Sequence, residues 1–319
     1  MISDSLIRAQ LPYALSETNL PELGQLYRGK VRDNYGREDR IVMITTDRVS
    51  AFDRVLGTIP FKGEVLQRLT VFWFEKVKSI AKTHLLAAPD PNAMVVRRAE
   101  PLPVEIVVRG YITGSLWRDY ASGNARAYGI SWPPGLRKDE RLSEPVITPS
   151  TKASPGQHDE PLSEGEILGR RLVSPEVWRV AHFLALRLFD LGTEWAKSRG
   201  LILVDTKYEM GISGGELIVI DEIHTPDSSR YWLDEGYEDR FERGVDQEML
   251  DKENIRQWLL RERGFSGEGE PPALPDDVRI QLARKYMEVF ERLTGQCFLS
   301  EVGGVEARLR TNLAGSGHL

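Results

Sequence analysis

Three charged side chains alternate along one apolar stretch near the middle of the sequence. Residues 201–204 are Leu-Ile-Leu-Val, which is typical of a buried strand, and Asp205, Lys207 and Glu209 follow at every second position. Strand periodicity puts these three on one face, and inward-facing charges are costly unless they meet ligands or each other. A second apolar run, ending before Asp221, predicts the return strand of a hairpin. Glu209 and Asp221 could therefore hold magnesium against nucleotide phosphates; the alternative is a structural lysine–carboxylate network.

A second motif combines an apolar strand with an anion-binding pattern. Residues 103–115 read Pro-Val-Glu-Ile-Val-Val-Arg-Gly-Tyr-Ile-Thr-Gly-Ser, so the strand leads into Arg109 and then a turn that ends at Ser115. A guanidinium can pair bidentately with phosphate, and a serine hydroxyl can donate to the same anion. The alternative is a plain strand end at which Arg109 pairs with a carboxylate.

Gly24-x-x-x-x-Gly29-Lys30 nearly matches a phosphate-binding P-loop. Val31 stands where that motif needs Ser or Thr for magnesium, and no apolar helix follows, which excludes a P-loop fold. Lys30 could still place an ammonium over phosphates from a strand–turn–strand. Taken alone, this motif favours a solvated hairpin.

Two polar segments are candidates for binding loops. Residues 47–53 directly follow an apolar strand, and the sequence favours a ligand-binding loop and a surface turn equally. Residues 131–172 contain six of the 18 prolines, which predicts a long loop. It carries Lys152 and Asp159, so a functional loop is favoured. The neighbouring His158 has no other His or Cys nearby to complete a metal site or triad.

The remaining pattern predicts elements that position these residues. Short β-prone runs dominate the first hundred residues, with one helix at residues 65–77. A long helix starts after Ser174 and ends near Gly200, and two more close the chain around residues 255–263 and 278–293. We therefore expect an α+β protein of two lobes.

Composition narrows the class of protein. The 319 residues carry a net charge of −6, which argues against a nucleic-acid binder. The single cysteine, Cys297, excludes an intramolecular disulfide, and no apolar stretch is long enough for a membrane span. There is no signal-peptide pattern, so a cytoplasmic protein is expected.

Taken together, the motifs resemble the phosphoribosylaminoimidazole-succinocarboxamide synthase (SAICAR synthetase) family. The matching segments occur in family order, and the strings PVEIVVRGYITGS and LVDTKYEMG are highly specific. The matches are residues 29–33, 47–53, 103–115, 203–211 and 221–230. The long middle loop and the tail beyond residue 250 resemble the long form of the family.

The resemblance implies a ligase of purine biosynthesis that joins carboxyaminoimidazole ribonucleotide (CAIR) to L-aspartate. ATP would convert the carboxylate to an acyl phosphate, with ADP and phosphate released, and magnesium would assist. The implied fold is similar to two-lobed ATP-grasp and kinase-like proteins: a β-rich lobe at 1–108, a mixed α/β lobe at 109–319, and the nucleotide between them. A monomer is favoured. The rivals are a small-molecule kinase on a similar fold and a nucleotide-sensing module without turnover.

The resemblance also implies a role for individual residues. Lys30 and Arg32 would bind ATP, and Glu105 and Val107 would line the adenine pocket. Glu209 and Asp221 would hold magnesium. The expected substrate-binding residues are Asp47, Ser50, Arg109, Ser115, Asp205 and Arg230, with the two arginines and Ser115 on the 5′-phosphate of CAIR. The expected catalytic residues, near the reacting groups, are Lys207, Lys152 and Asp159.

Overall fold

The computed structural model describes residues 3–152 and 159–319, and its N-terminal part is built on a five-stranded antiparallel sheet. The strands lie in the order β1-β2-β3-β7-β6. Their bounds are β1 (Gln25–Arg28), β2 (Arg32–Gly36), β3 (Arg40–Thr45), β6 (Leu85–Asp90) and β7 (Ala93–Arg97). Along β3, Val42 and Ile44 face one hydrophobic cluster and Met43 faces the other, as strand alternation requires. Both faces of the sheet are therefore buried at its centre, whereas the edge strand β1 is exposed.

The second sheet contains the strands that carry most of the predicted site. Its central order is β10-β9-β12-β13, with β8, β11 and β14 paired to β9 or β12. The bounds are β8 (Glu100–Pro101), β9 (Val104–Ile112), β10 (Glu140–Ile147), β11 (Ser150–Thr151), β12 (Leu201–Ser213), β13 (Glu216–Ile220) and β14 (Ser229–Leu233). The predicted hairpin is confirmed, because Ser213 pairs with Glu216 across a turn of two glycines. A separate hairpin joins β4 (Arg48–Ala51) to β5 (Arg54–Thr58).

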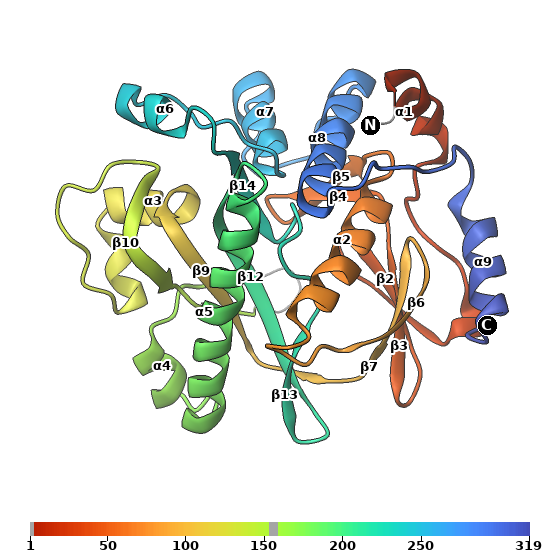
Figure 1. The fold of residues 1–319 in the computed structure, drawn as a ribbon, viewed down its shortest axis with the longest axis horizontal. Helices are drawn as coiled ribbons and strands as arrows, with labels where there is room; N and C mark the ends of the chain where they lie inside the picture. The colour runs from red at the N-terminus through yellow and green to blue at the C-terminus, as the bar shows by residue number, and fades with distance from the viewer. Residues whose placement is uncertain (1–2, 153–158) are drawn as a thin grey trace.

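Helices cover both sheets (Figure 1). The long predicted helix is α5 (Pro175–Lys197), and Ser174 caps it by accepting a hydrogen bond from the Val177 amide. The other predicted helices are α2 (Lys62–Val77), α7 (Glu253–Arg263) and α8 (Asp276–Thr294). Further helices are α1 (Asp4–Gln10), α3 (Gly114–Ala121), α4 (Glu164–Gly169), α6 (Tyr237–Arg243) and α9 (Val305–Gly315).

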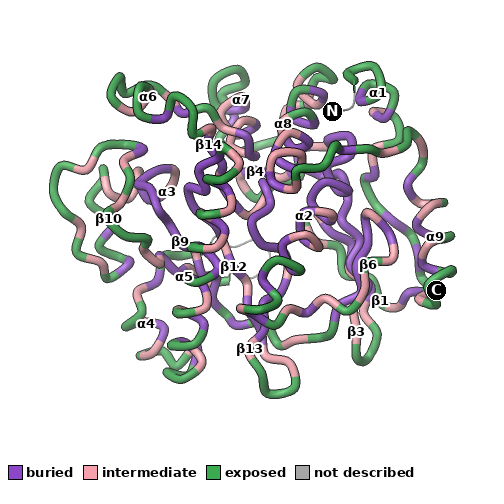
Figure 2. Tube along the Cα trace, viewed as in Figure 1, coloured by how far each residue is buried: buried purple, intermediate pink, exposed green. Residues whose placement is uncertain are grey.

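The predicted boundary between two lobes, at residues 108 and 109, falls within one strand. Both residues lie inside the continuous strand β9. The C-terminal helix α9 packs its Leu309 and Leu313 against Val42 of the first sheet, so the end of the chain returns to the N-terminal part. One large hydrophobic cluster also joins both sheets, and buried backbone runs through β9, β12 and α2 in Figure 2. Packing, and not sequence order, decides which segments belong together.

The long loop predicted at residues 131–172 is wrong in part, because this segment contains β10, β11 and α4. Strand β10 is largely exposed and contains Pro145 within a bulged register, so it lacks the apolar alternation that identifies a strand. Its pairing is supplied by β9. Among residues 3–152 and 159–319, no helix is long and apolar enough to cross a membrane.

Candidate active site

Residues from distant parts of the chain converge on a cavity of about 450 Å³. Strands β9 and β12 contribute to its wall, together with residues from both neighbouring hairpins and the start of α7. Twelve of the fifteen predicted site residues line it: Lys30, Arg32, Ser50, Glu105, Val107, Arg109, Ser115, Asp159, Asp205, Lys207, Asp221 and Arg230. The other three are Asp47, Lys152 and Glu209. The sequence motifs therefore belong to one site.

Two arginines meet one carboxylate at one end of the cavity. Strand register puts Asp205 of β12 opposite both Arg109 of β9 and Arg230 of β14. The Arg109 guanidinium donates to Asp205 at 3.2 Å and to the Ser115 hydroxyl at 3.1 Å, and Arg230 also pairs with Asp205. Gly114 is required here, since a Cβ on it would lie 2.5 Å from the Arg230 guanidinium. Arg230 also lies 3.6 Å from Glu253, so the two guanidinium groups face two carboxylates at this end.

A chain of alternating charges runs along the same face of β12. The Lys207 ammonium lies 2.8 Å from Glu105 of β9 and 2.8 Å from Glu209, and Lys152 also pairs with Glu209. Burial alone would lower the pKa of Lys207, but Glu209 and Glu105 raise it well above its usual value. Burial would likewise raise the pKa of Glu209, yet Lys207 and Lys152 hold it at about 2. Both groups are therefore charged at neutral pH. Asp159, the first described residue after position 158, lines the cavity. His158 lies outside the described residues.

The hairpin brings the two proposed magnesium ligands together. Glu209 pairs in register with Ile220, next to Asp221. Arg32 of β2 lies 2.7 Å from Asp221 and 2.8 Å from Glu222. Burial raises the pKa of Asp221 to about 6, against the pull of Arg32 and with the help of Glu209. Each of Glu209, Asp221 and Glu222 thus has a cationic partner here.

Two carboxylates alone make a partial cation site. Among the described residues, no group of three or more His, Cys, Asp or Glu could hold a metal ion. Magnesium usually keeps one or two protein carboxylates and completes its shell with water and phosphate oxygens. Glu209 and Asp221 fit that donor set when a nucleotide phosphate is present, and they do not fit an all-protein cage.

Two predicted residues of the N-terminal part, Lys30 and Ser50, line the cavity. The Lys30 side chain is 55% exposed at the cavity, where it pairs with Asp53, and Ser50 of β4 lines the same wall. Lys30 can therefore reorient toward an incoming phosphate at low cost.

Asp47 does not fit the predicted role in substrate binding. It is buried, and its two oxygens accept hydrogen bonds from the backbone amides of Leu15 at 2.7 Å and Gly63 at 2.8 Å. Burial raises the pKa of this carboxyl to about 6. Buried backbone donors need acceptors, so Asp47 joins three segments of the fold instead of facing the cavity.

Seven charged residues of the cavity wall are absent from the predicted site: Asp53, Glu222, Asp227, Asp251, Lys252, Glu253 and Arg256. Burial lowers the pKa of Lys252 to about 8, and Arg256 lies 3.2 Å from Glu253. A signal was present as the run Asp-Lys-Glu shortly before the apolar stripe of α7.

His224, whose role the sequence leaves open, is buried away from the cavity. It has no exposed surface, and its Nε2 lies 2.5 Å from the Tyr208 hydroxyl. Burial lowers its pKa to about 3, so the ring is neutral at physiological pH. His224 is a core residue that packs edge-on against Trp73.

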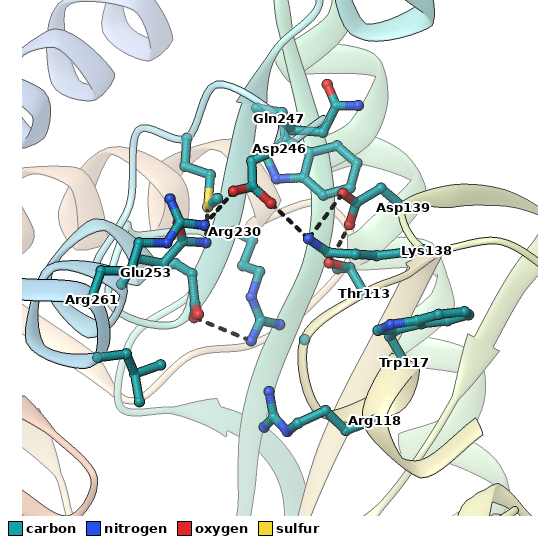
Figure 3. A pocket seen from close by; sticks show the side chains of 15 residues that line it. Thr113, Trp117, Arg118, Lys138, Asp139, Arg230, Asp246, Gln247, Glu253 and Arg261 are labelled. Atoms are coloured by element: carbon teal, nitrogen blue, oxygen red, sulfur yellow. Dashed lines mark hydrogen bonds and ion pairs between the residues drawn. The ribbon is translucent and has the colours of Figure 1, made fainter. Parts of the chain in front are cut away.

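A second cavity of about 340 Å³ adjoins the first, and we refer to it as the outer cavity (Figure 3). Arg230 and Glu253 line both cavities and lie 3.6 Å apart. In the outer cavity Lys138 reaches Asp246 at 2.7 Å, and Arg261 also pairs with Asp246. Its charges therefore largely neutralise one another.

Comparison with known proteins identifies the family. The family model described as SAICAR synthetase matches residues 25–271. The phosphoribosylaminoimidazole-succinocarboxamide synthase of Legionella pneumophila (strain Lens) is 44% identical over 310 residues, covering 95% of this chain and 98% of that protein. The synthase of Bacteroides thetaiotaomicron is 43% identical, covering 94% and 98%.

Solved structures agree with this result. The structure described as SAICAR synthase from Saccharomyces cerevisiae complexed with SAICAR has a TM-score of 0.78 and 32% identity, covering 90% of this chain and 100% of that one. A SAICAR synthetase in complex with ADP shares the fold, with a TM-score of 0.66 at 24% identity. The mixed α and β content predicted from the sequence is confirmed by these neighbours. The chain belongs to the SAICAR synthetase family.

Proposed function

We propose that this chain is an ATP-dependent ligase that joins CAIR and L-aspartate through an amide bond to give SAICAR. Family membership supports the reaction, since the curated relatives described above carry the name of this synthase. The observation that carries the proposal is the charged face of β12. Arg109 of β9 and Arg230 of β14 flank Asp205 at one end of this face, and Glu209 lies near Asp221 toward the other, which suits two phosphate-bearing substrates and a magnesium ion.

The arginine end is suited to the 5′-phosphate of CAIR. Arg109 and Arg230 converge on Asp205, and Ser115 supplies a hydroxyl beside Arg109. Guanidinium forks match the oxygens of a phosphate dianion. This contact is remote from the reacting carboxylate and serves to position the ring.

The other end is suited to ATP. Lys30 and Arg32 come from the N-terminal sheet region, and Glu105 and Val107 come from β9 on the opposite wall. The nucleotide would therefore lie between the two sheets, as in two-lobed ATP-grasp and kinase-like proteins. A SAICAR synthetase of the same fold was solved in complex with ADP, which supports a nucleotide as one ligand. Glu209 and Asp221 would hold magnesium, which neutralises phosphate charge when bound.

The chemistry needs no covalent enzyme intermediate. A carboxylate oxygen of CAIR attacks the terminal phosphorus of ATP, and ADP leaves. The aspartate amine then attacks the acyl carbon, loses a proton, and phosphate departs. Lys207 would orient the reacting carboxylate, and Lys152 and Asp159 would approach it from the segment between β11 and α4. Positioning and charge neutralisation account for catalysis in such a site.

One assay tests the function and excludes its rivals. ADP formation is measured with CAIR, aspartate or ATP omitted in turn, and the product is detected by mass. We expect SAICAR only with all three. ADP release that requires CAIR but ignores aspartate would indicate the small-molecule kinase, an alternative that the named relatives do not support. Nucleotide binding without any ADP would indicate a sensing module.

A further inference from the structure

The segment between β13 and β14 connects two parts of the site and adopts an unfavourable backbone. It begins at Asp221, and Arg230 follows at the start of β14. Asp221 has φ 65° and His224 has φ 54°, both in the left-handed region that disfavours residues other than glycine. Such conformations persist only where the surroundings hold them. We refer to residues 221–229 as the connecting turn.

Asp227 fastens the connecting turn to two helices. Its Oδ2 lies 2.7 Å from the Lys62 ammonium of α2, and its Oδ1 accepts a hydrogen bond from the Tyr286 hydroxyl of α8 at 2.6 Å. Lys62 has no exposed surface, Tyr286 is 1% exposed, and the ammonium lies 5.6 Å from the tyrosine ring centroid. Both carboxylate oxygens are thus held by buried donors from outside the turn.

The two donors come from different helices: α8 lies in the upper part of the molecule in Figure 1, and α2 lies below it. Helices α2 and α8 pack against each other, and Phe290 and Val65 belong to the same core cluster. Helix α8 lies beyond residue 271, where the match to the family model ends. The C-terminal part of the chain therefore reaches the candidate site through Tyr286.

We propose that Lys62 and Tyr286 are positioning residues that act through Asp227 to hold the connecting turn, so that Asp221 and Arg230 face the cavity together. The proposal rests on the function proposed above, because it assigns those two residues to magnesium and to CAIR. It also gives helix α8, which carries Tyr286, a function in the site beyond packing.

The charge state of Asp227 agrees with this arrangement. Burial alone would raise its pKa, but Lys62 and Lys252 together with the Tyr286 hydroxyl hold it at about 2. An ionised carboxylate is the form that accepts both hydrogen bonds. Asp227 also lines the cavity, so its own substitution would not separate positioning from direct ligand contact.

The test removes only the Tyr286 hydroxyl. Tyr286→Phe is compared with Tyr128→Phe, in which the lost hydroxyl donates at 2.9 Å to Asp119, a carboxylate that does not line the main cavity. We expect Tyr286→Phe to weaken the binding of magnesium-ADP and of CAIR about three- to tenfold, the worth of one hydrogen bond, and Tyr128→Phe to change neither by more than about 1.5-fold. Hydrogen exchange in residues 221–230 should become faster only in Tyr286→Phe.

A purely structural role gives a different result. If Tyr286→Phe lowered the melting temperature but left both binding constants and the exchange of residues 221–230 unchanged, the proposal would be overturned. Equal effects of Tyr128→Phe would overturn it as well. Lys62→Met tests the second donor, and Lys62→Arg should restore part of the lost affinity, because it restores the charge.

Failure of the proposed function would be recognised separately. Binding of magnesium-ADP and hydrogen exchange need no turnover, so the positioning role can be measured even in a chain that makes no SAICAR. A wild-type chain that binds neither CAIR nor nucleotide would contradict the proposed function itself.

Discussion

The main cavity and the outer cavity share a wall, but they shift the pKa of a lining carboxyl in opposite directions and differ in the exposure of their charged side chains. In the main cavity, burial raises the pKa of Asp251 to about 7. In the outer cavity, hydrogen bonds from Lys138 and Arg261 lower the pKa of Asp246. The Arg109 and Asp205 side chains are 7% and 6% exposed, whereas Lys138 and Arg261 are 46% and 61% exposed.

The difference indicates which cavity is built to bind charged ligands. Exposed ion pairs are screened by water and contribute little, whereas groups removed from water interact strongly with any charge that enters. In the outer cavity, Lys138 and Arg261 pair with Asp246 and are exposed to solvent, so these charges are stabilised without a ligand. The main cavity holds Asp205 between two arginines and Asp221 beside Arg32, all largely removed from water, so these groups interact most strongly with an added phosphate or cation.

The largest effect is expected at the carboxylates. Glu209→Gln or Asp221→Asn should reduce turnover by at least about a hundredfold at limiting magnesium, because each removes one of two anionic ligands. Initial rates across a magnesium titration, with circular dichroism to verify folding, provide the measurement. Near-normal rates in both variants would show that the cation is held elsewhere.

A smaller effect is expected at the arginine end. Arg230→Ala should raise the apparent constant for CAIR about ten- to a hundredfold, since one charge-assisted contact is worth about 1.5–3 kcal/mol. The constants for ATP and aspartate should move much less, and Arg109→Ala should act alike. Steady-state kinetics with each substrate varied will measure this. Weakened aspartate binding with CAIR unaffected would assign Arg230 to the amino-acid pocket.

The pH dependence of stability should differ between the two cavities. Asp251 is buried and accepts backbone hydrogen bonds from Tyr231 and Glu253, and its pKa is about 7 in the folded chain against an ordinary 3.8. Between these values the folded chain binds more protons than the unfolded chain. The free energy of unfolding therefore falls as pH rises from about 4 to about 7.

Asp251→Asn should remove this contribution, so that its free energy of unfolding falls less steeply over that window than that of the wild type. Urea unfolding at pH 5 and pH 7.5 measures the change. Asp246→Asn is the matched control from the outer cavity, and it should keep the wild-type dependence because the pKa of Asp246 is lowered. Identical slopes for all three proteins would contradict the assignment.

The smallest effect is expected in the outer cavity. Lys138→Met removes an exposed cation that pairs with Asp246, which keeps Arg261 as a partner. We expect apparent constants for CAIR, ATP and aspartate within about twofold of the wild type, as for other exposed ion pairs. The same kinetic assay applies. A tenfold change for any substrate would show that the outer cavity takes part in binding.

Local pattern was sufficient where charges interrupt an apolar strand. Asp205, Lys207 and Glu209 were predicted to share one face because strand periodicity is fixed at two residues. In the structure Asp205 pairs with two arginines, and Lys207 pairs with Glu209. Arg109 was predicted as an anion ligand or as the partner of a carboxylate. It pairs with Asp205 and lines the cavity, so the two alternatives are compatible.

The local sequence pattern was misleading where a side chain is positioned by residues far away in the sequence. Asp47 follows a strand as a binding residue would, but the backbone amides of Leu15 and Gly63 take both its oxygens. Lys252 and Arg256 lie at the start of a predicted helix, and only the tertiary structure, in which Glu253 of α7 lies 3.6 Å from Arg230 of β14, brings them into the cavity wall. Neighbouring residues in the sequence predict neither the hydrogen bonds of Asp47 nor the position of Lys252 and Arg256 in the cavity wall.

The sequence by itself determined the face of β12, the hairpin that brings Glu209 near Asp221, the long helices and the family. These follow from periodicity, turn chemistry and short motifs, whose information lies within a few residues. Only the tertiary structure decided that Asp205 lies between Arg109 and Arg230, that Asp47 faces inward, and that α9 returns to the first sheet. Strand register and helix packing join residues far apart in the chain, and they depend on burying the whole core at once.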